Sequence, residues 1–409
     1  MSIFVEMNLS RNIAVIGGGA SGFMAAITAK ETNISSNVTI FEKTDKLLAK
    51  VKISGGGRCN VTNATYSLSK LVKSYPRGGK QLKKSFNIFN TKNTVDWFES
   101  KGVKLKTEED NRIFPQSNNS ESIVNILIST AEKLAIKVSL KSKVNNIQET
   151  KHGFILNINN EKLLFEKIII ASGGSAKSSG FEWISSLGYK IINPVPSLFT
   201  FNMPKNPITR LMGLSVSDVT ARIKGSTLKQ TGPLLITHWG MSGPAILKLS
   251  SWGARDLADL NYNFTVQVNW LTLNEEIVRE RIMKISSNKK IYNHNPFIIP
   301  KRLWFFLLEK LEITEDKIWR ELSKKNKNRL INTLINDEYE IKGKTTFKEE
   351  FVSCGGISLS EVNMLTMESK RHKGLYFVGE FLDIDGVTGG FNFQAAWTTG
   401  YLAGKNSAS

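Results

Sequence analysis

The sequence predicts an α/β fold: a Rossmann-like domain of the two-dinucleotide-binding type, with β-rich and helical segments in the middle of the chain. The first observation is an apolar run at residues 13–16, typical of a strand buried on both faces, followed by G-x-G-x-x-G and a second buried run at 38–41. The second is a further apolar run that enters Ser172-Gly-Gly174. The third is a change in the sequence pattern after residue 194, where several prolines mark a domain boundary.

The glycines at the first turn have separate tasks in a dinucleotide site. Gly17 permits the tight turn, Gly19 lets the backbone approach a diphosphate, and Gly22 lets the following helix, expected at 23–30, pack closely on the strand. The helix N-terminus favours phosphate, and Glu42 lies where a carboxylate accepts both ribose hydroxyls. The acid disfavours a 2′-phosphate, so FAD or NAD is preferred over NADP. The alternative is a glycine-rich turn without a ligand.

The remaining elements follow in chain order. Ser120 caps a helix that reaches about Ala135, and residues 198–270 carry the short alternating runs of β structure. A buried strand near the C-terminus ends in Gly379-Glu380. The other expected strands lie at 137–140, 153–158 and 165–171, and the other expected helices at 275–285, 301–311, 315–325, 328–336 and 395–404.

Two further turns carry polar or glycine-rich chemistry. The triple glycine at 55–57 predicts a loop that presses against a flat ring, where Arg58 meets phosphate or developing negative charge and Asn60 reads a heteroaromatic edge. A structural hairpin is the alternative. The Gly-Gly-Phe-Asn turn at 389–392 precedes a helix and therefore predicts a cradle for an anion and a heterocycle.

Length and composition limit the class of protein. A chain of 409 residues is long enough for two or three domains, and no run of eighteen apolar residues predicts a transmembrane helix. Residues 1–11 lack the features of a signal peptide. Cys59 and Cys354 are the two cysteines and are far apart, which favours a reducing, cytoplasmic location and argues against a disulfide reductase.

The net charge of +19 attracts polyanions such as RNA, DNA or an anionic membrane surface. Basic residues interleave with aromatic ones at 66–101, and a dense basic run occupies 317–329. The alternatives are compositional drift in a chain rich in Lys, Asn and Ile, aromatic residues that belong to the core, and solvated helix faces.

These segments together resemble the YhiN/BaiN-type FAD-dependent flavoprotein family. The resemblance is carried by Gly-Gly-Gly-Ala-Ser-Gly at 17–22, Ile-Ser-Gly-Gly-Gly-Arg-Cys-Asn-Val-Thr-Asn at 53–63, the Thr-His-x-Gly-x-Ser-Gly-Pro turn at 237–244 and the Gly-Glu-x-Leu-Asp segment that runs to Gln394. It implies bound FAD and a discontinuous flavin domain at 1–195 and 346–409. The insert would consist of a β-rich domain at 196–272 and a helical domain at 273–345.

The resemblance also implies contacts to FAD, position by position. Glu42 would hold the adenosine ribose, with Lys43 beside it, and Val144 would meet adenine through its backbone. Leu48 and Ala49 replace the glycine and basic residue that the family usually has before Lys50. The remaining contacts are Gly17, Gly19, Ala20 and Gly22 to the diphosphate, Lys50, Arg58 and Asn60 near the isoalloxazine, Gly173 in the second glycine turn, Glu380 to the ribityl–diphosphate stretch, and Gly390, Phe391 and Asn392 to the ring end.

Members of this family look like reductases of activated carbon–carbon double bonds, in substrates from steroid-like enones to a uridine of ribosomal RNA. Such a reaction needs a hydride from the flavin and a proton donor. Cys354 and His238 are the candidate donors, with Cys59 as a third; each is otherwise a buried or structural residue. No metal site is expected.

Three functions remain open at this point: an RNA uridine reductase, an oxidoreductase of a small unsaturated metabolite, and a non-catalytic flavoprotein that docks on RNA. Ribosomal RNA is the expected partner of the first and third, and no membrane contact is expected. No second G-x-G-x-x-G follows a strand, so NAD(P)H or another reductant is expected to visit the flavin transiently. The oligomeric state is left open.

Overall fold

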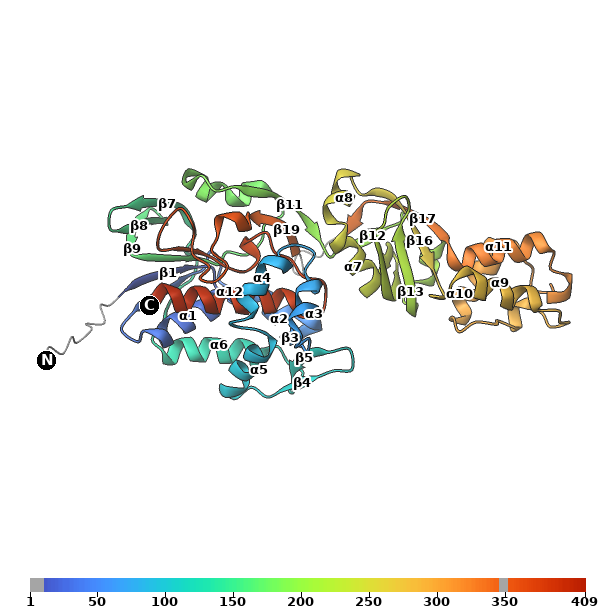
Figure 1. Ribbon diagram of the computed structural model, residues 1–409, viewed down its shortest axis with the longest axis horizontal. Coiled ribbons are helices and arrows are strands. Elements are labelled where there is room, and N and C mark those ends of the chain that lie inside the picture. Colours follow the sequence, from blue (N-terminus) through green and yellow to red (C-terminus); the bar gives the residue numbers. More distant parts are fainter. Residues whose placement is uncertain (1–10, 346–351) are drawn as a thin grey trace. The chain divides into compact units, whose positions relative to one another are not determined.

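The computed structural model describes residues 11–345 and 352–409, which form two compact units (Figure 1). The first contains residues 11–196 and 352–409, and the second contains residues 197–345. The expected boundary at residue 346 and most of the N-terminal segment 1–11 lie outside the described residues. The four-part division of the chain therefore stays a prediction.

A five-stranded parallel sheet organises the first unit, in the order β20-β10-β1-β2-β6. Helix α1 (Ala20–Thr32) connects the two central strands, and its apolar side chains are buried. The predicted Rossmann-like α/β fold is confirmed. The strands are β1 (Asn12–Ile16), β2 (Asn37–Phe41), β6 (Lys137–Ser139), β10 (Lys167–Ile170) and β20 (Leu375–Phe377).

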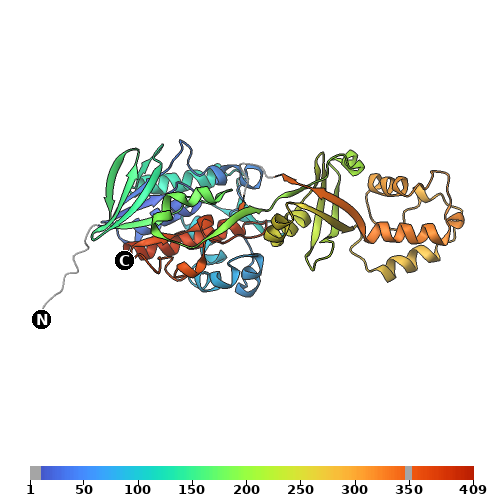
Figure 2. The same ribbon diagram turned by 90° about the horizontal axis from the view of Figure 1, so that it is seen from above.

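Helix α12 (Phe391–Ala408) lies beside α1 in both views (Figures 1 and 2). A Cβ atom at Gly400 would lie 2.5 Å from the carbonyl oxygen of Ser21, and one at Gly404 would lie 2.3 Å from that of Ala25. The two helices are therefore parallel, and their backbones are nearly in contact. Helix α12 begins four residues before the sequence predicted, because Gly390 adopts a left-handed conformation and starts the helix there.

Smaller elements surround this framework. The aromatic residues Tyr75, Phe86 and Phe89 of the basic segment 66–101 are buried, so they belong to the core rather than to a nucleic-acid surface. The elements are α2 (Ala49–Gly57), β3 (Thr62–Asn63), α3 (Leu68–Leu71), α4 (Gly79–Phe86), α5 (Thr91–Ser100), β4 (Leu105–Thr107), β5 (Arg112–Pro115), α6 (Glu121–Lys133), β7 (Val144–Thr150), β8 (Gly153–Ile158), β9 (Glu161–Phe165), β11 (Ile191–Ser197) and β19 (Val352–Ile357).

The second unit is built on a seven-stranded antiparallel sheet in the order β17-β16-β13-β14-β15-β12-β18. Buried tryptophans from the sheet and the helices, Trp270, Trp304 and Trp319, share one core. Residues 337–345, which the sequence assigned to the helical part, return to the sheet. The elements are β12 (Thr200–Asn202), β13 (Ser215–Ile223), β14 (Lys229–Thr237), β15 (Gly240–Ser242), β16 (Asn263–Asn269), β17 (Asp337–Lys342), β18 (Lys344–Thr345), α7 (Pro244–Trp252), α8 (Ala254–Asp259), α9 (Glu275–Lys284), α10 (Lys301–Lys310) and α11 (Lys324–Ile335).

Across residues 11–345 and 352–409, no helix combines the length and apolar character that a membrane span requires. The cytoplasmic location stays a prediction.

The contact between α1 and α12 generates a stability prediction. Gly404→Ala places a methyl group against the Ala25 carbonyl, and we expect it to lower the free energy of unfolding by about 1–3 kcal/mol despite the better helix propensity of alanine. Urea unfolding followed by circular dichroism measures this. Lys405→Ala, on the exposed side of the same helix, is the matched control. Equal stability of the two variants would contradict the close contact.

Candidate functional site

The first glycine turn has the geometry of a dinucleotide turn. Gly17 has φ +115°, and a Cβ atom there would lie 2.3 Å from the carbonyl oxygen of Ala171. A Cβ atom at Gly22 would lie 2.0 Å from the carbonyl oxygen of Gly17, whereas the space beside Gly19 is open to at least 4 Å. Gly17 and Gly22 thus serve packing, and Gly19 leaves room for a ligand.

The N-terminus of α1 suits a diphosphate. Gly19 is its N-cap residue and offers no side-chain acceptor, and the first turn contains no acidic residue. The N–H groups of Ala20 and its neighbours are therefore not capped by the protein, and the helix dipole favours an anion there. The N-terminus of α12 has the same character, with Gly390 as its N-cap and no acid in its first turn.

Glu42 follows β2 and lies beside the glycine turn. Its Oε2 accepts a 2.9 Å hydrogen bond from the N–H of Gly18, and its Oε1 accepts from the N–H and the hydroxyl of Thr44, each at 2.9 Å. These bonds fix the orientation of a half-buried carboxylate. Lys43 is exposed next to it. The contacts of Glu42 to ribose and of Lys43 to the cofactor stay predictions.

The triple-glycine loop meets the C-terminal turn. In the amide orientation that satisfies both of its ends, Asn60 donates to the Thr62 carbonyl at 2.9 Å and accepts from the N–H of Gly390 at 2.9 Å. Arg58 instead pairs with Glu108 at 2.6 Å. The structure thus joins Asn60 and Gly390, and it shows Arg58 engaged by a protein carboxylate; its contact with the ring stays a prediction.

Glu380 joins three separate segments of the first unit. Its Oε2 lies 2.6 Å from Lys50 Nζ, and its Oε1 accepts a 2.8 Å hydrogen bond from the N–H of Ser353. A Cβ atom at Gly174 would lie 2.8 Å from the same Oε1, and the neighbouring Gly173 has φ +78° with open space beside it. The predicted residues Lys50, Glu380 and Gly173 therefore lie at one place.

The side chains at the start of α12 support the turn before it. Asn392 accepts from the N–H of Gly386 at 2.8 Å and donates to its carbonyl at 3.0 Å. Phe391 is buried and its carbonyl accepts a 2.7 Å bond from Tyr75 Oη. The contacts of Gly390, Phe391 and Asn392 to the ring end of the cofactor stay predictions. Val144, at the start of β7, is buried and pairs with Ile158; its contact to adenine stays a prediction.

The candidate proton donors have different surroundings. Cys354 lies fully buried in β19, next to Ser353, which binds Glu380. Cys59 is also fully buried, and desolvation raises the pKa of its thiol from 9.0 to about 12. His238 is exposed on the turn between β14 and β15 of the second unit, edge-on to Trp239 at 4.3 Å between ring centroids. All three roles stay predictions.

Some residues that build this site were missed by sequence reasoning. Ser353 had no motif around it. Arg77 stood out only as one basic residue among many, yet it forms a bidentate ion pair with the fully buried Asp385. The Asp383-Ile-Asp385 segment before the glycines was the available signal, because an acid in an apolar run needs a partner.

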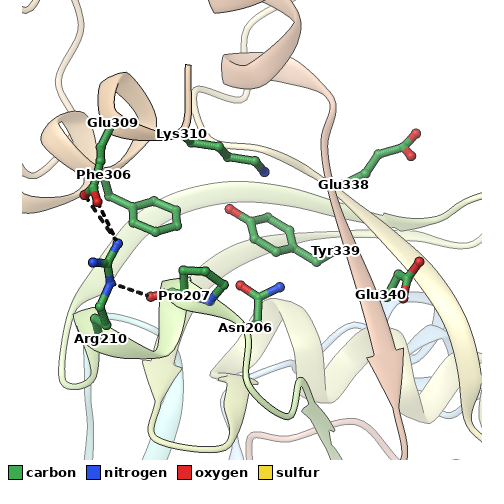
Figure 3. A pocket seen from close by; sticks show the side chains of 9 residues that line it. All are labelled: Asn206, Pro207, Arg210, Phe306, Glu309, Lys310, Glu338, Tyr339 and Glu340. Carbon is green, nitrogen blue, oxygen red and sulfur yellow. Dashed lines mark hydrogen bonds and ion pairs between the residues drawn. The ribbon is translucent and has the colours of Figure 1, made fainter. Parts of the chain in front are cut away.

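A separate cavity of about 420 Å³ lies in the second unit (Figure 3). Its cations are paired within the protein: Arg210 with Glu309 at 3.1 Å, and Lys310 with the buried Asp337 at 2.5 Å. It contains none of the predicted cofactor or catalytic residues. Its lining consists of Asn206, Pro207, Arg210, Phe306, Glu309, Lys310, Glu338, Tyr339 and Glu340.

Two glycine turns, an uncapped helix N-terminus and an oriented carboxylate on a parallel sheet define an FAD-binding Rossmann protein, and the open space at Gly19 and Gly173 fits that cofactor. The chain belongs to the HI0933-like family, whose Rossmann-domain model matches residues 11–406. The protein is an FAD-dependent oxidoreductase.

The chain is similar to curated relatives over nearly its whole length. It is 29% identical to a 3-dehydro-bile acid delta(4,6)-reductase of Clostridium scindens, over 97% of this chain and 98% of the relative. It is 27% identical to a ribosomal RNA dihydrouridine synthase of Haemophilus influenzae, over 96% of this chain and 97% of the relative, and 27% identical to that of Escherichia coli, over 96% of each.

Solved structures show the same fold at low identity. FrdA of Escherichia coli quinol fumarate reductase matches with a TM-score of 0.52 and 14% identity, over 98% of this chain and 70% of that one. The 3-ketosteroid delta1-dehydrogenase of Sterolibacterium denitrificans matches with a TM-score of 0.51 and 10% identity, over 98% and 99%. These likenesses concern the fold alone.

The position of Glu42 generates a binding prediction. Glu42→Gln keeps one acceptor for Gly18 but removes the charge expected to hold the ribose, and we expect the Kd for FAD to rise on the order of 10- to 100-fold. Fluorescence titration of the apoprotein with FAD measures it. Glu121→Gln, which disrupts the surface pair with Lys52, is the control. An unchanged Kd would remove Glu42 from the site.

The buried cysteines generate a reactivity prediction. Since the pKa of Cys59 is raised to about 12, its thiol is protonated at pH 8 in the folded protein, whereas an unfolded cysteine near its ordinary 9.0 is partly thiolate. Cys354 is equally buried. We expect no rapid reaction of the native protein with a disulfide reagent at pH 8, and reaction of both thiols in urea. A fast native thiol would contradict this burial.

Proposed function

We propose that the protein reduces a carbon–carbon double bond conjugated to a carbonyl group, in a uridine of ribosomal RNA. The reactions named for the relatives share this chemistry: one saturates a bond of a 3-oxo bile acid and the other saturates the pyrimidine ring of uridine. FAD, when bound, supplies the hydride. The chain must position the acceptor carbon, exclude water and deliver a proton to the neighbouring carbon.

The residues described above divide these tasks. The N–H groups at the start of α1 bind the diphosphate, and Glu42 binds the ribose. Glu380, held by Lys50 and Ser353, orients the middle of the cofactor, and the Asn60–Gly390 junction supports its ring end. Each contact uses a donor or acceptor of the chemistry that the cofactor group requires.

Cys354 is the proposed proton donor, because its strand is tied to Glu380 through the bond between Ser353 and that carboxylate. His238 is the second candidate, because an exposed imidazole on a turn is able to approach a substrate. The electron donor is NAD(P)H or another reductant that binds transiently.

Positive charge is the observation that favours RNA as the substrate. The chain carries a net +19, and within the flavin unit residues 66–101 contain eight lysines and arginines against two acidic residues. This segment packs on α12, whose N-terminal turn is the proposed ring end of the site. A polyanion is therefore attracted to the part of the molecule where the reduction occurs.

A small unsaturated metabolite is the second candidate substrate. The bile acid reductase, 29% identical over nearly the full length, favours it. The two candidates differ in how reduced enzyme is reoxidised. Small cyclic enones that reoxidise the flavin rapidly, with no effect of added RNA, would support the metabolite. Tight RNA binding without any substrate-driven reoxidation would support a docking role.

The RNA proposal predicts a change in ribosomal RNA. Deleting the gene should remove one dihydrouridine from ribosomal RNA, and the purified enzyme with FAD and NAD(P)H should restore it in that RNA. Mass spectrometry of nuclease fragments measures both. Enzyme carrying Glu42→Gln at limiting FAD is the control. Ribosomal RNA with identical dihydrouridine content in both strains would reject this substrate.

A further inference from the structure

Helix α4 (Gly79–Phe86) presents a face made of lysines. Lys80, Lys83 and Lys84 are exposed, while Leu82 and Phe86 on the other side are buried in the core. Positions three and four residues apart lie on the same side of a helix, so the three ammonium groups form one patch. Lys70 and Lys73, in α3 and the turn that follows it, are also exposed.

The helix dipole acts in opposite ways on the lysines of this patch. Lys83 and Lys84 lie in the last turn of α4, where the dipole favours cations. Lys80 lies in the first turn of α4, where the helix dipole disfavours a cation and where no acidic residue is present. Lys80 and Lys84 repel each other, by a few tenths of a kcal/mol for like charges at this spacing. Within the part of the chain that the structure describes, no carboxylate forms an ion pair with any of the three lysines.

Helix α9 in the second unit provides a contrast. There Arg279 pairs with Glu275 at 2.5 Å, and Lys284 pairs with Glu280 at 2.5 Å, both four residues apart. Two of the three cations of α9 are thus paired with acids of their own helix. Helix α4 contains no acidic residue, so the charge of its lysines stays available to an anion outside the protein.

The patch is attached to the turn before α12. Arg77, two residues before α4, pairs with the fully buried Asp385, and the N–H of Val387 donates to the carbonyl of Ser74 at 2.9 Å. Tyr75 Oη donates to the carbonyl of Phe391 at 2.7 Å. A ligand on α4 is therefore fixed relative to the proposed ring end of the flavin site.

We propose that the Lys80–Lys83–Lys84 face of α4 binds the phosphate backbone of the RNA whose uridine is reduced; this rests on the function proposed above. Lysine ammonium groups act as flexible point charges that suit phosphate. Three aromatic residues beside the patch, Tyr75, Phe86 and Phe89, are buried. The exposed groups of the α4 face are ammonium groups, which suit the phosphate backbone rather than the bases.

The test compares two triple variants of the full-length holoenzyme with the same change in charge. One is Lys80→Gln, Lys83→Gln, Lys84→Gln. The other, on α11, is Lys324→Gln, Lys325→Gln, Arg329→Gln, whose three side chains are also exposed. Glutamine has nearly the same helix propensity as lysine, so both variants should fold. The probe is ribosomal RNA purified from cells that lack the gene.

The α4 variant should bind this RNA more weakly, by on the order of 10- to 100-fold at about 0.1 M salt, and its salt slope should fall by roughly 2. The α11 variant should stay within about twofold of wild type. The flavin spectrum, the Kd for FAD and the melting temperature should be unchanged in both variants, which separates the loss of an RNA-binding surface from damage to the flavin site.

Three other results would contradict the proposal that this face of α4 binds RNA. These are wild-type RNA that does not bind, an α4 variant with wild-type affinity, or an α11 variant that loses as much as α4. The function is judged separately by dihydrouridine formation. If RNA binds through α4 but no dihydrouridine forms, the RNA-binding surface is supported and the proposed reaction is rejected. If dihydrouridine forms equally well with the α4 variant, the proposed reaction is supported and the RNA-binding surface is rejected.

Discussion

Helices α1 and α12 lie parallel with almost no side chain between their backbones, because Gly400 and Gly404 face the carbonyl groups of Ser21 and Ala25. Since Gly400 meets the start of α1 and α12 begins at Phe391, the N-terminus of α12 extends about two turns, roughly 12 Å, beyond that of α1. The two helix N-termini, which both attract anions, thus point in the same direction but are offset along the helix axis. In FAD the ribityl chain separates the central diphosphate from the isoalloxazine ring, and two helix ends at different depths suit such a separation.

The order of the parallel strands explains where the carboxylates lie. Glu42 follows β2 and Glu380 follows β20, on opposite sides of β1 in the sheet. Both acids have each oxygen engaged, Glu42 by N–H and hydroxyl groups and Glu380 by Ser353 and Lys50. The orientations of both carboxylates are therefore fixed by the protein before a ligand arrives.

The parts of this fold that depend on neighbouring residues were predictable from the sequence. The β1 strand, the glycine turn and Glu42 follow one another within about thirty residues, and each has a local signal. Other parts depend on partners far away in the chain. The bond between Ser353 and Glu380 and the pair between Arg77 and Asp385 arise from tertiary structure, as does the capture of Arg58 by Glu108. The early start of α12 depended on a left-handed glycine that a pattern of small residues does not reveal.

Buried and exposed charges in the basic segment obey different constraints. Removing one partner of a buried ion pair such as Arg77–Asp385 typically costs about 3–5 kcal/mol, so Arg77 is required by the fold whatever the protein binds. The exposed lysines of α4 have no buried partner, and replacing Lys80 by a neutral residue would relieve its repulsion with Lys84. The fold therefore explains why the segment is anchored to the turn before α12, but it does not explain why its outer face is cationic. The Arg77–Asp385 pair therefore serves stability, whereas the exposed lysines of α4 are available to a negatively charged partner.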